Sequence, residues 1–132
     1  MPIFLDTHAW VWWVTEDHRL SRGAARAIQR ASRGTGVSLS VISIWEIAKK
    51  VEKKQLVLDR PAREWIEHAL GVPGLALVEV TPAILMESCE LPQPFHGDPA
   101  DQIIVASARH HGATLVTKDS NIRRYEHVST VW

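Results

Sequence analysis

The chain has 132 residues, 45% of them hydrophobic, which suits one domain with a buried core and excludes both a disordered chain and two domains of ordinary size. Lys plus Arg and Asp plus Glu both number 15, so nucleic-acid binding would depend on local clusters of charge. The single cysteine, Cys89, excludes an internal disulfide, and no apolar run approaches the roughly 20 residues that span a bilayer. We therefore expect one domain over residues 1–132, in the cytoplasm, with no signal peptide and no contact with a membrane.

Short apolar runs in chain order are typical of buried strands. They lie at 3–5, 37–39, 75–80 and 114–116, with a weaker fifth at 128–131. Apolar residues at helical spacing lie between them, at 20–31, 41–51 and 65–70. Two more helices are expected where an N-cap residue precedes proline, at Thr81-Pro82 and at Asp98-Pro99, and the second should end at His110. Strands that alternate with helices predict an α/β fold with a mainly parallel sheet.

Acidic residues occupy the positions where such a sheet forms its sites, beyond the carboxyl ends of the strands. Asp6 directly follows the first predicted strand, and Glu46 lies near the start of the helix after the second. Asp98 and Asp101 lie at the start of the last predicted helix, and Asp119 follows the fourth strand. The sequence therefore predicts carboxylates from four distant segments at one edge of the sheet.

Carboxylates held this close together repel one another and raise each other's pKa unless a cation neutralises them. Mg²⁺ prefers hard oxygen ligands and keeps several waters, so a few carboxylates and a substrate phosphate suffice to bind it. Such an ion activates water and stabilises the charge that develops in a phosphoryl displacement. No His or Cys set has zinc-like spacing, so the pattern favours a hard cation.

Each acid also has a purely structural explanation. Asp6 is explained as a turn residue, but it interrupts an otherwise apolar stretch, and a buried unpaired carboxylate is costly, so a ligand role is favoured. The other structural explanations are a capping box of Ser43 and Glu46, an N-cap at Asp98, a cap contact at Asp101, and an ordinary turn at Asp119. The shared location of the five acids, rather than any one of them, indicates a site.

Four motifs, in this order, resemble those of the PIN-domain family and in particular of its VapC-type ribonuclease toxins. They are LDTHAW at 5–10, SIWEIAKK at 43–50, HGDPADQ at 96–102 with an apolar stretch after it, and LVTKD at 115–119. The likeness runs from the first residues to Trp132. The third motif departs from the family at Gly97 and Gln102, where arginine is frequent.

The resemblance implies a three-layer α/β/α sandwich around a central, mainly parallel sheet. It implies a metal-dependent endoribonuclease that uses Mg²⁺ or Mn²⁺ to hydrolyse RNA phosphodiester bonds, as the toxin of a type II toxin–antitoxin pair that inhibits translation or growth. A small antitoxin would block the site, the toxin would form a homodimer, and operator DNA would be bound only through the antitoxin. By position, the catalytic and metal-binding residues would be Asp6, Glu46, Asp101 and Asp119, with Asp98 as a further ligand and Thr7 and Ser43 as hydrogen-bonding support.

Basic residues near these motifs have two interpretations. The helix with Glu46 carries lysines at i,i+4 spacing, which contact either the RNA backbone or only solvent. The arginines after Asp119 have the same two interpretations, and a third is that they contact an acidic antitoxin segment. The candidates for RNA contacts are Lys49, Lys50, Lys53 and Arg123.

Other marked residues are assigned to structure. Trp10 and Trp13 share a helical face and are expected in the core or a subunit interface rather than stacked on bases. His8 and His96 are assigned to local structure, and Cys89 is expected to be a small core residue.

Two other function classes remain as alternatives. A non-catalytic PIN-like module would bind RNA or protein without cutting, but all the acidic positions are filled here. A receiver domain with a phosphoacceptor would need adjacent acids after its first strand, whereas Asp6 is followed by Thr7.

Overall fold

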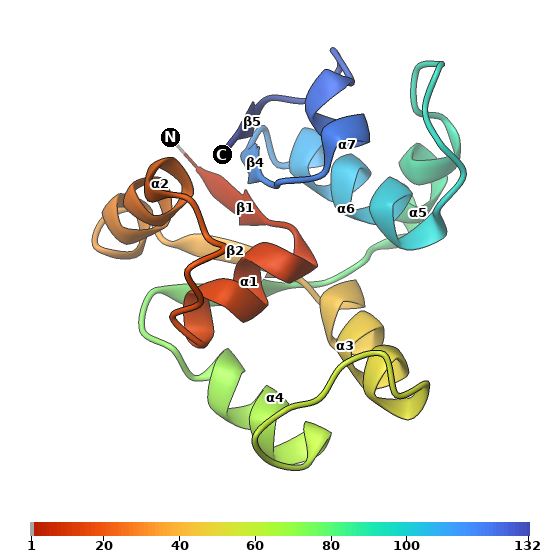
Figure 1. The fold of residues 1–132 in the computed structure, drawn as a ribbon. Helices are drawn as coiled ribbons and strands as arrows, with labels where there is room; N and C mark the ends of the chain where they lie inside the picture. The colour runs from red at the N-terminus through yellow and green to blue at the C-terminus, as the bar shows by residue number, and fades with distance from the viewer. Residues whose placement is uncertain (1) are drawn as a thin grey trace.

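The computed structural model describes residues 2–132, whose strands form one five-stranded sheet (Figure 1). The strands are β1 (Ile3–Leu5), β2 (Val37–Ser40), β3 (Leu75–Val78), β4 (Thr114–Val116) and β5 (Thr130–Val131). The sheet order is β3-β2-β1-β4-β5, and every neighbouring pair is parallel. The predicted α/β fold is confirmed, with a sheet that is parallel throughout. The predicted runs at 75–80 and 128–131 were too long, because pairing stops at Val78 and begins at Thr130.

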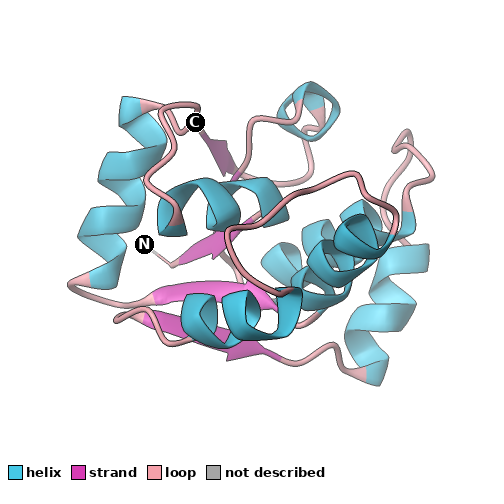
Figure 2. Ribbon diagram, turned by 60° about the horizontal axis from the view of Figure 1, so that its bottom comes forward, coloured by secondary structure: helices cyan, strands magenta, loops and turns pink. Residues whose placement is uncertain are grey.

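Helices surround the short strands (Figure 2). They are α1 (Thr7–Val14), α2 (Arg22–Ser32), α3 (Ile42–Glu52), α4 (Ala62–Leu70), α5 (Pro82–Cys89), α6 (Pro99–His110) and α7 (Ser120–Arg124). The caps predicted for α5 and α6 are present, since Thr81 accepts from the backbone N–H of Ile84 and Asp98 from that of Asp101. Within residues 2–132, no helix combines the length and the hydropathy needed to cross a membrane.

The core lies in two layers, one on each face of the sheet. Ile3 and Leu5 of β1 pack with α1, α2 and α4, whereas Phe4 between them packs with α5, α6 and α7. This alternation is the period of two that a strand imposes on its side chains. Figure 1 shows α5, α6 and α7 gathered beside β4 and β5, away from α2 and α4. Two helical layers around a sheet are the predicted three-layer sandwich.

Trp10 and Cys89 test the structural assignments made from the sequence. Trp10 is fully buried, as predicted, and its indole N–H donates to the carbonyl of Ala69 at 3.3 Å. The prediction of a core position for Cys89 is wrong, because this last residue of α5 is exposed. The helix turns Ile84 and Ser88 to the interior instead.

The chain reverses its direction across the sheet between β1 and β4. From β1 it proceeds outward to β2 and β3, and then returns to the other side of β1 to form β4 and β5. The backbone N–H of Asp6, directly after β1, donates to the carbonyl of Val116, the last residue of β4, at 3.0 Å. Open parallel sheets form their sites at this kind of switch point.

Candidate active site

Asp6 is a buried carboxylate at the switch point, with 4% of its surface exposed. It is the N-cap of α1, because its Oδ1 accepts from the backbone N–H of Thr7 at 2.8 Å. Its Oδ2 accepts from the hydroxyl of Thr117, directly after β4, at 2.7 Å. Within the described chain, only His8 comes within ion-pair distance of it, at 3.7 Å from Oδ2. Burial lowers the pKa of His8, so this imidazole is a weak counter-charge for Asp6.

Glu46 reaches the same place from α3. Its Oε1 accepts from the hydroxyl of Thr7, which also lies 2.8 Å from the Ser43 hydroxyl. Burial raises the pKa of Glu46, and the negative charges of Asp6 and Asp101 raise it further. Thr7 and Ser43 therefore stand where the resemblance expected hydrogen-bonding support.

The capping-box interpretation of Ser43 and Glu46 is wrong. The N-cap of α3 is Val41, two residues earlier, and Ser43 is fully buried inside the first turn. The turn before the helix is instead stabilised by Ser40, whose hydroxyl accepts from the backbone N–H of Ile42 at 3.2 Å. Because the helix starts earlier, Ser43 and Glu46 are both free to bond Thr7 across the site.

Asp101 enters the site from the first turn of α6. Its Oδ2 is hydrogen-bonded to Nε2 of His96 at 2.8 Å. Burial raises the pKa of Asp101 to about 6, and repulsion from Asp6, Asp98 and Asp119 adds to this effect. Asp98 is exposed and acts as the N-cap of α6, which confirms its structural explanation.

Asp119 lies beyond the end of β4 and is the N-cap of α7. Its Oδ1 accepts from the backbone N–H groups of Asn121 and Ile122, at 2.9 and 3.0 Å. Its own backbone N–H donates to the hydroxyl of Thr117 at 3.0 Å. The Thr117 hydroxyl therefore ties Asp119 to Asp6, although Asp119 also serves as a cap.

Three residues at this site were not recognised as site residues from the sequence. Thr117 bonds Asp6, His96 bonds Asp101, and His8 accepts from the backbone N–H of Lys118 at 2.9 Å while lying beside Asp6. The signal for Thr117 was available, since it follows β4 as Asp6 follows β1. The contact of His96 depends on the loop before α6, which no periodicity describes.

The donor set fits a hard divalent cation bound partly through water. Asp6, Glu46 and Asp101 interact electrostatically, yet within residues 2–132 no three His, Cys, Asp or Glu side chains form a ready-made cage around an ion. Mg²⁺ in proteins is usually bound by one or two carboxylates, with waters and substrate phosphate as its other ligands. A buried Asp6 with no Lys or Arg partner among the described residues is the group such an ion would neutralise.

The predicted RNA-contacting residues differ in how they are placed relative to the carboxylates. Lys49 pairs with Glu52, at 2.9 Å between Nζ and Oε1, and Lys53 also lowers the pKa of Glu52. Lys50 is exposed and close enough to Glu46 to lower its pKa. Arg123 is exposed on α7. Of these four residues, Lys50 is the one with a recorded electrostatic effect on the site.

The raised pKa of Asp101 predicts a pH dependence of stability without metal. The folded protein binds the proton of the Asp101 carboxyl more tightly than the unfolded chain, in which this carboxyl has its ordinary pKa of 3.8. The free energy of unfolding should therefore fall, by on the order of 2 kcal/mol, as the pH rises from about 4 to about 6. Urea unfolding in EDTA at pH 4.5 and 7.5 measures this fall. Asp101→Asn should remove this share of the pH dependence and leave the contribution of Glu46, which has the same sign, and that of His8, which has the opposite sign. Equal pH dependence in both proteins would contradict the assignment.

Replacing Thr117 with valine should impair both the site and the fold. Valine keeps the shape of the side chain but leaves Oδ2 of Asp6 without the Thr117 donor and the backbone N–H of Asp119 without its acceptor. We expect a loss of roughly 1–3 kcal/mol in the free energy of unfolding and about tenfold slower RNA cleavage. Denaturant titration and a cleavage time course measure both effects, and the exposed Thr35→Val is the matched control. Cleavage at the unaltered rate would show that Thr117 does not position Asp6.

Comparison with known proteins bears out the family resemblance. The PIN domain family model matches residues 3–128. Ribonuclease VapC22 of Mycobacterium tuberculosis is 36% identical over 132 residues, which is 98% of each chain. The fold matches VapBC2 of Rickettsia felis bound to a promoter DNA fragment, with a TM-score of 0.70 and 17% identity over 98% of this chain and 97% of that one. A toxin–antitoxin complex from Klebsiella pneumoniae matches over the same shares, with a TM-score of 0.66 and 20% identity. The chain therefore belongs to the PIN-domain family, in the branch of the VapC ribonucleases.

Proposed function

We propose that this protein is a Mg²⁺- or Mn²⁺-dependent endoribonuclease that hydrolyses RNA phosphodiester bonds as the toxin of a toxin–antitoxin pair. The observation that carries the proposal is the buried Asp6 carboxylate at the switch point, which lacks a Lys or Arg partner in the described chain and interacts with Glu46 and Asp101. The likeness of this chain to Ribonuclease VapC22, which covers 98% of the chain, supports the same activity.

The residues that would hold the ion are Asp6, Glu46 and Asp101, with Asp119 and Asp98 nearby. A divalent ion supplies a water of lowered pKa and neutralises charge that develops on the phosphate. The chain's own groups fix the carboxylates for this task. The N–H of Thr7 and the hydroxyl of Thr117 hold Asp6, the hydroxyl of Thr7 orients Glu46, and His96 orients Asp101.

The partners follow from the relatives. Structures with the same fold include toxin–antitoxin complexes, and three of the matched structures are bound to DNA, so we propose a small antitoxin as the partner and operator DNA as bound only through it. Lys50 near the carboxylates is the best placed of the predicted RNA contacts, ahead of Lys49, Lys53 and Arg123. One PIN domain over residues 1–132, acting in the cytoplasm, completes the proposal.

A homodimer is also part of the proposal. Large apolar side chains that remain exposed on the monomer are the candidates for the surface that the dimer would cover. They include Trp45 on α3, Leu77 on β3, and Leu85 and Met86 on α5, with exposed fractions of 43–61%. Light scattering of the purified chain without antitoxin measures its mass, and a monomer at all concentrations would contradict this part.

Incubation with RNA and defined metal ions tests the activity. Total RNA should be cut when Mn²⁺ or Mg²⁺ is present, remain intact in EDTA, and be cut again when excess Mn²⁺ is restored. Addition of the cognate antitoxin should stop the reaction. Intact RNA with both ions, or equal cleavage in EDTA, would contradict a metal-dependent ribonuclease.

A further inference from the structure

A cavity of about 470 Å³ opens beside the carboxylates, between the loop before α6 and helix α7. Its size lies in the range of sites for small ligands. It is lined by Pro94, Phe95, His96, Asn121, Arg124 and Tyr125.

The cavity shares a wall with the candidate active site. His96 lines it and at the same time bonds Asp101, with 2.8 Å between Nε2 and Oδ2. The loop that carries His96 is held by Gln102, whose side-chain amide donates to the His96 carbonyl at 3.2 Å. Helix α7 begins at its cap Asp119 and ends at Arg124, so the opposite wall also starts at a site carboxylate. A group in the cavity would therefore lie next to a phosphate bound at Asp101.

Aromatic rings form much of the wall. Phe95 is half-buried, with its ring centroid 4.7 Å from that of Tyr125 and 4.3 Å from that of His96. Tyr125 is buried, and its hydroxyl donates to the carbonyl of Pro92 at 2.6 Å, which fixes the ring. Rigid aromatic faces suit a flat apolar ligand with polar edges.

Polar groups at the mouth are arranged to donate hydrogen bonds. Arg124 donates from Nη2 to the Oδ1 of Asn121 at 2.8 Å, and among residues 2–132 the side-chain NH₂ of Asn121 and the other guanidinium donors have no hydrogen-bond partner. No carboxylate is among the residues that line the cavity. The mouth therefore favours a ligand that carries acceptors and negative charge.

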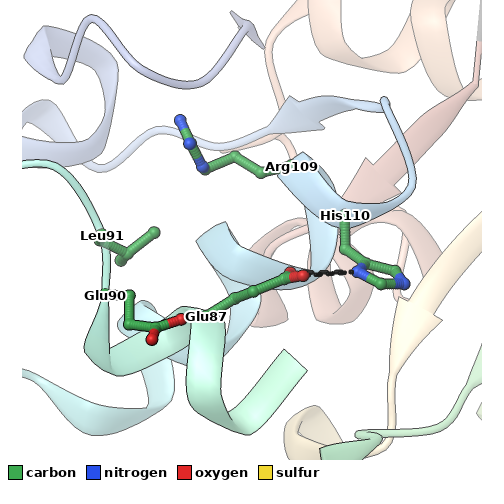
Figure 3. Close-up of a pocket in the computed structure, with 5 residues that line it drawn as sticks. All are labelled: Glu87, Glu90, Leu91, Arg109 and His110. Carbon is green, nitrogen blue, oxygen red and sulfur yellow. Dashed lines mark hydrogen bonds and ion pairs between the residues drawn. The ribbon is translucent and has the colours of Figure 1, made fainter. Parts of the chain in front are cut away.

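The cavity in Figure 3 offers the opposite chemistry. It is lined by Glu87, Glu90, Leu91, Arg109 and His110, between α5 and α6. His110 Nδ1 lies 3.0 Å from both carboxylate oxygens of Glu87, and Arg109 donates to the carbonyl of His127. The two glutamates of this lining would repel a polyanion, and its arginine, Arg109, already donates to a backbone carbonyl. Between these two cavities, the charges favour the aromatic one for RNA.

We propose that the aromatic cavity is a base-recognition pocket, which receives one unstacked nucleobase of single-stranded RNA adjacent to the phosphate that is cut. The base stacks on Phe95, the amide of Asn121 bonds its edge, and Arg124 contacts the neighbouring phosphate. This inference rests on the proposed ribonuclease function and adds to it a determinant of the cleavage sequence. The alternative occupant of the cavity is an acidic segment of the antitoxin, which would pair with Arg124.

Binding is tested first without cleavage. The ¹⁵N-labelled full chain in EDTA is titrated with AMP, CMP, GMP and UMP, and amide shifts are followed by NMR. We expect the amide shifts to be concentrated at residues 94–96 and 121–125 and the affinities of the four nucleotides to differ. Phe95→Leu and Arg124→Gln should each lower the affinity roughly 5- to 100-fold. Arg26→Gln, which removes an exposed charge from α2, should bind as the unaltered protein does. Absent shifts, or shifts that persist in both variants, would overturn the pocket.

Cleavage of an RNA pool with random sequence provides the second measurement. With Mn²⁺, Phe95→Leu and Asn121→Ala should lose the base preference at one position beside the cut, while Arg26→Gln keeps it. Arg124→Gln, which removes a phosphate contact, should slow the cleavage of all sequences alike. An unchanged preference in both Phe95→Leu and Asn121→Ala would overturn the inference while leaving the ribonuclease intact. Nucleotide binding without any cleavage would contradict the ribonuclease and leave the pocket standing. Variants that weaken only antitoxin binding would assign the cavity to the antitoxin and overturn our proposal.

Discussion

Replacing Asp6 with asparagine should abolish RNA cleavage while the protein stays folded. The change removes the negative charge of the most buried carboxylate at the site, and with it the group that a divalent ion would neutralise. Asparagine still caps a helix N-terminus, so its side-chain oxygen can accept from the N–H of Thr7 as Asp6 does. Glu46 and Asp101 would lose a repulsive neighbour, which offsets part of the cost of the change. We expect cleavage at least about a hundredfold slower and a change in stability of less than about 1 kcal/mol.

The measurement is a cleavage time course with Mn²⁺, together with urea unfolding of the same preparation. Asp59→Asn is the matched control, because this carboxylate lies on an exposed loop with 70% of its side chain accessible. The control should cleave at the rate of the unaltered protein. A folded Asp6→Asn protein that keeps more than about a tenth of the activity would remove Asp6 from the catalytic machinery.

Replacing Trp10 with alanine should cost a large part of the stability of the fold. Trp10 is fully buried, its ring meets that of Trp65 edge-on at 5.3 Å, and its N–H is bonded to Ala69. Truncating a buried tryptophan leaves a large cavity and costs roughly 3–5 kcal/mol, out of the 5–15 kcal/mol that holds a typical domain. Since Trp10 lies one turn beyond Asp6 on α1, the site should lose its geometry with the fold.

Urea denaturation and circular dichroism at 37 °C measure this effect. Trp45→Ala, measured at a protein concentration at which the chain is monomeric, is the control of the same chemistry. Trp45 is 55% exposed on the monomer, so its truncation should change the monomer's stability by less than about 0.5 kcal/mol. Similar losses in the two variants would contradict the division into a core and a surface tryptophan.

The elements with strong local signals were predictable from sequence. β1 and β4 are short apolar runs with clear ends, and α6 begins at Asp98-Pro99, where the cap and the proline mark its first residue. The site acids were predictable for a related reason, since parallel strands bring their carboxyl ends to one edge. Asp6 and Asp119 therefore had to follow neighbouring strands once β1 and β4 were paired.

The parts that sequence did not predict depend on contacts between distant segments. The segment of α1 from Ala9 to Val14 is entirely apolar, so it lacks the polar face that marks an amphipathic helix, and α7 is too short for a period. Ser43 fits a capping box by spacing, but its bond to Thr7 joins residues 36 positions apart. His96 and Asp101 are only five positions apart, but their contact depends on the irregular loop before α6, where Gln102 also bonds the His96 carbonyl. Local patterns contain none of this information.

Isothermal titration calorimetry with MnCl₂ at pH 7.5 tests most directly whether the carboxylates from distant segments form one cation site. The unaltered protein should take up manganese saturably, magnesium should compete for the same site, and Asp6→Asn and Asp101→Asn should each bind at least about tenfold more weakly than Asp59→Asn. Absence of saturable uptake by the unaltered protein, or equal uptake by all three variants, would contradict the account.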